Sequence, residues 1–77
     1  MTLDQFLKAL LDEGLPGATP RLVAAALLAR ELVQAHDKAA ADAAANGLQR
    51  LATSIRARRK AIEREMLECV QAEGARS

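Results

Sequence analysis

Two residues have side chains that commonly bind transition metals or act as nucleophile and base, Cys69 and His36. A zinc site takes about four such ligands, and a catalytic cysteine needs a base within hydrogen-bonding reach. If the chain reverses at Asn46-Gly47, Cys69 and His36 lie about 18 Å apart along the resulting hairpin, at a rise of 1.5 Å per residue. No second cysteine, HExxH pattern, glycine-rich phosphate loop or serine nucleophile motif accompanies them. We therefore expect no catalytic residue, no metal site and no cofactor, and we expect that the protein is not an enzyme.

The charge of the chain is most concentrated in one basic run. Residues 50–60 hold five cations and no acid, although the whole chain has a net charge of only +1. Such a run can bind the phosphates of a nucleic acid or face a partner protein. The run has no aromatic residue to stack on a base, and its cations fall on several sides of a helix. We favour a larger protein as the partner, with a nucleic-acid-binding regulator that uses residues 50–64 as the alternative. The predicted partner-binding residues are Arg56, Arg58, Arg59 and Lys60.

Residue composition predicts an all-α protein. Alanine supplies 18 of the 77 residues, Phe6 is the only aromatic residue, and β-branched residues are few. Alanine favours helices, whereas aromatic and β-branched residues favour strands. The longest apolar run, Leu22 to Ala29, is shorter than the roughly 18 residues of a membrane span. The first charged residue is Asp4, an acid, where a signal peptide has basic residues. We therefore expect a cytoplasmic protein that does not enter a membrane.

Capping residues mark where the helices begin. Thr2 is followed three residues later by Gln5, which is the spacing of a capping box. Thr19 is a capping residue directly before Pro20, and proline is favoured at the first position of a helix. Apolar residues at helical spacing follow both signals. The sequence therefore predicts three helices, at about residues 3–13, 20–45 and 48–73.

Glycine and proline residues mark the connections between these helices. Gly14 suits the left-handed position after the first helix, and Pro16–Thr19 form a short connector. Asn46-Gly47 is the one interruption between the second and third helices, because both residue types accept the left-handed conformation. A turn there produces an antiparallel helical hairpin, which we favour over one continuous helix about 80 Å long. The chain is then a single helical domain, 1–77, with residues 74–77 as a frayed tail.

The predicted helices carry more apolar surface than a chain of this length readily covers. The segment from Leu22 to Ala29 is apolar on all sides, so we expect it to be buried all round. The third helix adds a separate apolar stripe, which favours assembly into a helical-bundle dimer. The predicted self-association residues are Leu22, Val23, Leu27, Leu28, Ile55, Ile62 and Met66.

Arg59 falls in the middle of the apolar stripe of the third helix, with Arg58 at its edge. A guanidinium group is not buried without a partner. In the hairpin Arg59 lies opposite Gln34, with Glu31 and Asp37 about one turn to either side, so an internal ion pair is one arrangement. The other is that Arg59 faces a bound partner. We favour the second, because two arginines interrupt the stripe.

The predicted function is that of a small non-catalytic helical protein-protein interaction module, an adaptor or an inhibitor of a larger protein, that self-associates. Catalytic groups are missing from the sequence, whereas amphipathic helices are a common way of contacting another protein.

Overall fold

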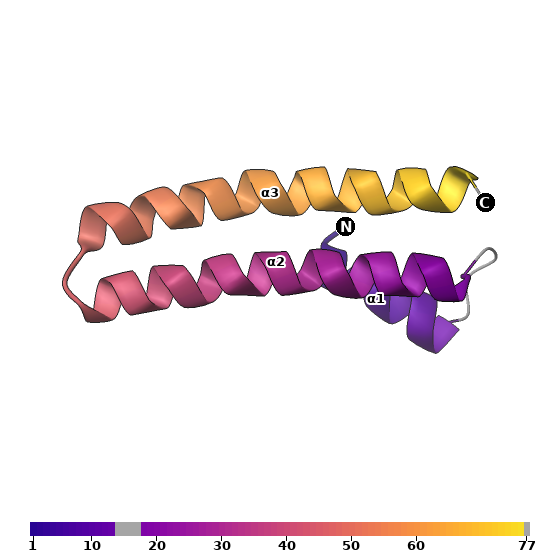
Figure 1. Cartoon of the computed structure of the whole chain (residues 1–77), viewed down its shortest axis with the longest axis horizontal. Coiled ribbons are helices and arrows are strands. Elements are labelled where there is room, and N and C mark those ends of the chain that lie inside the picture. Colours follow the sequence, from indigo (N-terminus) through magenta and orange to yellow (C-terminus); the bar gives the residue numbers. More distant parts are fainter. Residues whose placement is uncertain (14–17, 77) are drawn as a thin grey trace.

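All regular structure in the described part of the chain is helical. The computed structural model describes residues 1–13 and 18–76. The helices are α1, Leu3–Lys8, its π-helical continuation η1, Ala9–Glu13, then α2, Pro20–Ala45, and α3, Gln49–Arg76. Figure 1 shows α2 and α3 side by side as an antiparallel hairpin, with α1 beside the half of the hairpin away from the turn. The predictions of an all-α fold and of a helical hairpin are confirmed. None of the described helices is long and apolar enough to cross a membrane.

The starts of α1 and α2 are fixed by the predicted capping residues. The Thr2 hydroxyl accepts a hydrogen bond from the Gln5 backbone N–H at 3.2 Å, and the Gln5 side chain accepts one from the Thr2 N–H at 2.9 Å. The Thr19 hydroxyl accepts from the backbone N–H of Leu22 at 3.2 Å, with Pro20 as the first residue of α2. These side chains satisfy N–H groups that have no partner within the helix.

The turn between α2 and α3 lies at Asn46-Gly47. Gly47 has φ of +76°, the left-handed conformation that glycine adopts without strain. The backbone N–H groups of Gly47 and Leu48 then donate to the carbonyl groups of Ala44 and Ala43, at 3.0 Å and 2.8 Å. These bonds satisfy carbonyl groups at the end of α2. The chain therefore folds into a hairpin about 45 Å long, and the alternative of one continuous helix is wrong.

The ends of the helices differ in part from the prediction. Helix α3 continues to Arg76, so residues 74–76 are helical where we predicted a tail. Within this added turn lies Gly74, where a Cβ would be 3.2 Å from a methyl carbon of Leu22. The missing side chain lets the last turn of α3 pack closely on α2. The predicted cap at Gly14 and the first two residues of the Pro16–Thr19 connector lie outside the described residues.

Small side chains line the seam between α2 and α3. Ala26 and Ala52 are completely buried, and Ala29, Ala40 and Ala43 are nearly so. Alanine at a helix crossing lets the two backbones approach closely. Two ion pairs join the helices, Arg59 with Asp37 and Arg21 with Glu73, and their residue numbers sum to 96 and 94. The predicted placement of Arg59 opposite Gln34 corresponds to a sum of 93, which is close to these values.

Helix α1 and η1 complete the core on one side of the hairpin only. Leu3, Leu7 and Leu10 pack with residues of α2 and with Val70 of α3. The expectation that Leu22 to Ala29 is buried all round is wrong for the single chain. Leu22 is buried, but Leu28 is 66% exposed, because one short helix covers only one side of α2.

Candidate protein-interaction surface

The side of the hairpin away from α1 is apolar and has no covering element among the described residues. On α2 the positions that meet α1 include Arg30 and Gln34, which line a depression together with Leu7. Leu28 and Leu32 lie two residues earlier, about 200° around the helix, and so point to the opposite side. We call this side the uncovered face. It consists of Ala25, Leu28 and Leu32 of α2 and Leu51, Ile55, Ile62, Met66 and Cys69 of α3.

The part of the uncovered face farthest from the turn is hollowed into a groove with a volume of about 300 Å³. All but one of the side chains that line it are apolar or weakly polar, so water in the groove finds few hydrogen-bonding partners. The exception is Glu73, whose carboxylate pairs with Arg21 at 3.1 Å. The groove is lined by Ala25, Leu28, Ala29, Leu32, Met66, Cys69, Val70 and Glu73.

Exposed large apolar side chains lie on both helices of this face. Leu32 is 42% exposed on α2, and Leu51 is 51% exposed near the turn, whereas Leu7 in the core is 2% exposed. Each such side chain forgoes part of the roughly 1.5–3 kcal/mol that full burial of a leucine provides. Exposed apolar surface of this kind is characteristic of protein contact sites.

The structure divides the predicted self-association residues into two groups. Leu22 is buried in the core of the chain, and Val23 is partly buried against the same core. Leu27 is 37% exposed but lies about 100° around α2 from Leu28, outside the groove. The other four predicted residues lie on the uncovered face, where Leu28 is exposed and three residues of α3 are half-buried: Ile55, Ile62 and Met66. Sequence reasoning left out Leu32, Leu51 and Cys69.

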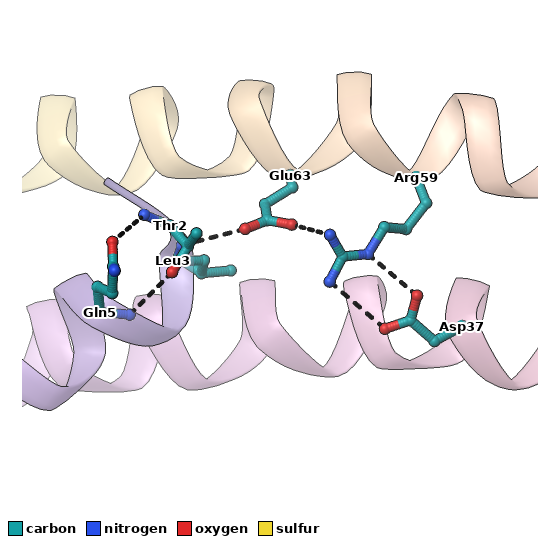
Figure 2. A network of polar contacts seen from close by, with 6 residues as sticks. All are labelled: Thr2, Leu3, Gln5, Asp37, Arg59 and Glu63. Atoms are coloured by element: carbon teal, nitrogen blue, oxygen red, sulfur yellow. Dashed lines mark hydrogen bonds and ion pairs between the residues drawn. The ribbon is translucent and has the colours of Figure 1, made fainter.

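Arg59 is held by a polar network within the chain (Figure 2). Its Nε donates to Oδ1 of Asp37 on α2 at 3.0 Å, and its Nη1 donates to Glu63 one turn along α3. The second oxygen of Glu63 accepts from the backbone N–H of Leu3 at 3.4 Å. The Glu63 side chain is 15% exposed, compared with 54% for Asp37. Arg59 thus joins α2 and α3, and Glu63 extends the network to the start of α1.

This network corrects the interpretation of Arg59. We favoured a contact with a bound partner, but the structure has the internal ion pair with Asp37 instead. The aliphatic stem of an arginine spans the apolar stripe and carries the charged group to a carboxylate on the neighbouring helix. The interruption of the stripe at Arg59 is therefore a cross-link between helices of one chain.

We expect Arg59→Ala to lower the free energy of unfolding by about 1–2 kcal/mol, because it removes charged hydrogen bonds at a partly buried site. For a domain of this size, 1 kcal/mol corresponds to about 4–8 °C in melting temperature. Arg58→Ala is the matched control, since Arg58 is exposed and makes none of the described ion pairs. Thermal melting followed by circular dichroism measures both. Equal melting temperatures for the two variants would contradict the role of the network.

The other predicted partner-binding residues remain exposed. None of the described hydrogen bonds or ion pairs involves Arg56, Arg58 or Lys60. Successive members of this set are two residues apart, so each lies about 200° around α3 from the one before. Arg56 and Lys60, four residues apart, therefore lie on the same side of α3, and Arg58 lies on the other.

The two candidate metal-binding or nucleophilic residues stay separate in the fold. Cys69 is exposed in the groove, whereas Nδ1 of His36 lies 3.0 Å from the carbonyl oxygen of Leu32. Within residues 1–13 and 18–76, no three His, Cys, Asp or Glu side chains come together in a way that would hold a metal ion.

Comparison of the chain with protein-family models, with curated proteins and with solved structures finds no match.

Proposed function

We propose that the chain is a non-catalytic helical protein-protein interaction module, an adaptor or inhibitor of a larger protein, that also self-associates. The observation that supports this proposal is the uncovered face, which carries exposed leucines on both helices, Leu28 and Leu32 on α2 and Leu51 on α3. Burial of such a face against another helical surface is a recurring mode of recognition.

The surface of α3 supplies a second, polar region for a larger partner. Arg56, Arg58 and Lys60 are exposed near the middle of the hairpin, and charged side chains around an apolar contact guide association and orientation. Only Arg56 and Lys60 of these three share a side of α3, and Arg58 points away from them, so we favour a protein partner over the longer phosphate track of a nucleic acid. Nucleic-acid binding remains the alternative outcome of the experiment.

The proposal is tested with the purified chain immobilised as bait for proteins from the cells that produce it. We expect wild-type chain to retain a partner that the Leu28→Asp variant loses, because a buried carboxylate has no counter-charge in the groove. Leu11→Asp is the matched control, since Leu11 is 58% exposed and lies in η1 rather than on the uncovered face. Circular dichroism confirms that all three chains are folded.

Two results would contradict the proposal. One is that wild-type chain and the Leu28→Asp variant retain the same proteins to the same extent. The other is tight binding of duplex or single-stranded nucleic acid that weakens steeply with rising salt, as counterion release requires.

A further inference from the structure

We propose that the uncovered face packs against the same face of a second copy of this chain, in an antiparallel four-helix bundle. The tip of each hairpin, at Asn46-Gly47, then lies over the open end of the other hairpin. This inference rests on the proposed self-association. It adds that a second copy of the chain covers the uncovered face and that the two hairpins run in opposite directions. Three features of the described residues support it: the distribution of charge, the position of the groove, and the sizes of the side chains along α2.

Charge is divided unequally along the hairpin. Residues 37–60, which form the half nearest the turn, hold six cations and two anions, a net charge of +4. Residues 1–12, 18–36 and 61–74, which form the other half, hold four cations and seven anions, a net charge of −3. Antiparallel packing brings unlike halves together, whereas parallel packing brings like halves together. Charge complementarity therefore selects a second copy in the antiparallel direction.

The groove lies at one end of the uncovered face, and the exposed Leu51 lies near the other. Leu51 precedes Cys69 of the groove by 18 residues, which is five helical turns, so the two side chains lie on the same side of α3. Antiparallel packing places Leu51 of each copy over the groove of the other. The groove volume of about 300 Å³ equals that of about ten water molecules in the bulk liquid, enough for the four carbons of a leucine side chain.

On the uncovered face, the side chains of α2 are large far from the turn and small near it. The end of α2 far from the turn presents Leu28 and Leu32 to the uncovered face, whereas the end near the turn presents the exposed Ala35 and Ala39. Ala39 follows Leu28 by 11 residues, close to three full turns, and thus lies on the same side of the helix. A two-fold axis that reverses the hairpins stacks α2 on α2. With Leu51 over Cys69 of the other copy, paired positions on α2 have numbers that sum to about 70, so Leu32 of each copy lies close to Ala39 of the other and the two Ala35 residues meet. Large side chains opposite small ones produce close packing.

The distance between the two Cys69 residues of a dimer depends on the relative direction of the two hairpins. With Leu51 over Cys69 of the second copy, paired positions on α3 have numbers that sum to about 120, and the two Cys69 residues lie about 27 Å apart along the bundle. Parallel packing would leave them at the same level on the diagonal of the bundle, about 14 Å apart when neighbouring helices are about 10 Å apart. A nitroxide label on Cys69 and a dipolar distance measurement distinguish the two arrangements.

We expect purified wild-type chain to be a dimer by light scattering over a micromolar concentration series. Leu28→Asp should weaken dimerisation at least about 100-fold, because the change affects both copies and leaves two carboxylates without counter-charges. Leu51→Cys should form covalent dimers through Cys69 of the second copy on mild oxidation. Thr53→Cys is the matched control that should not, since Thr53 lies about 200° around α3 from Leu51.

Each contrary result has a defined meaning. A wild-type chain that stays monomeric overturns the inference, and so does undiminished dimerisation of Leu28→Asp. A monomer that still captures a larger protein through Leu28 leaves the interaction module standing. Dimers with a short distance between labels, or with Cys69 joined to Cys69, overturn the antiparallel arrangement but leave self-association intact. A wild-type chain that neither dimerises nor captures a protein contradicts both proposals.

Discussion

Leu7→Ala is expected to lower the free energy of unfolding by about 2–5 kcal/mol, the range for truncation of a buried leucine. Leu7 is 2% exposed and lies in the core cluster with residues of α2 and α3. Its removal leaves a cavity where the short helix docks on the hairpin. A chain of 77 residues has a total stability of only about 4–12 kcal/mol. The variant should therefore be partly or largely unfolded at 37 °C.

The matched control is Leu11→Ala, the same chemical change one helical turn away. Leu11 is 58% exposed, so its truncation should change the free energy of unfolding by less than about 0.5 kcal/mol. Urea unfolding followed by circular dichroism measures both variants, at one protein concentration because self-association contributes to apparent stability. Similar losses for Leu7→Ala and Leu11→Ala would show that α1 is not docked as described.

Glu63→Ala is expected to lower the free energy of unfolding by about 2–3 kcal/mol, since hydrogen bonds to charged groups contribute about 1.5–3 kcal/mol. The carboxylate of Glu63 accepts from Arg59 and from the backbone N–H of Leu3, the first residue of α1. Its loss leaves the Leu3 N–H at a buried residue without this acceptor, and it removes a negative charge beside the start of a helix.

Glu65→Ala is the control for Glu63→Ala, because Glu65 is exposed on the same helix and takes part in none of the described ion pairs. Hydrogen exchange provides a second measurement. The amides of α1 should lose more protection than those near the turn, since Glu63 joins α1 to the hairpin. Equal stability of the two variants would show that the network in Figure 2 contributes little.

Local signals in the sequence were sufficient to predict where α1 and α2 begin and where the chain turns between α2 and α3. The Thr2 and Gln5 capping box, the Thr19-Pro20 start and the Asn46-Gly47 turn each act through neighbouring backbone groups, and all three are confirmed. The start and end of α2 agree with the prediction for the same reason. The end of α3 lies beyond the prediction, in a turn where Gly74 packs against Leu22, a contact between residues far apart in the sequence that local signals do not reveal.

The surface could be predicted only in part, because burial depends on where α1 docks. Leu22 and Leu28 belong to one apolar run, yet the first is 6% exposed and the second 66% exposed. Helical periodicity places each on a side of α2 but does not say which side another helix covers. The same holds for Leu51 and Cys69, whose place on the third-helix stripe was visible and whose exposure was not.

The sequence separation of the contacts has a consequence for the order in which they form. The Asn46-Gly47 turn joins residues that are neighbours in the chain, Arg59 and Asp37 are 22 residues apart, and Glu73 and Arg21 are 52 apart. The contact of Glu63 with Leu3 spans 60 residues. Because the entropy lost in closing a loop grows with its length, the hairpin closes from its turn outward. Helix α1, first in the sequence, is then last to join the folded structure.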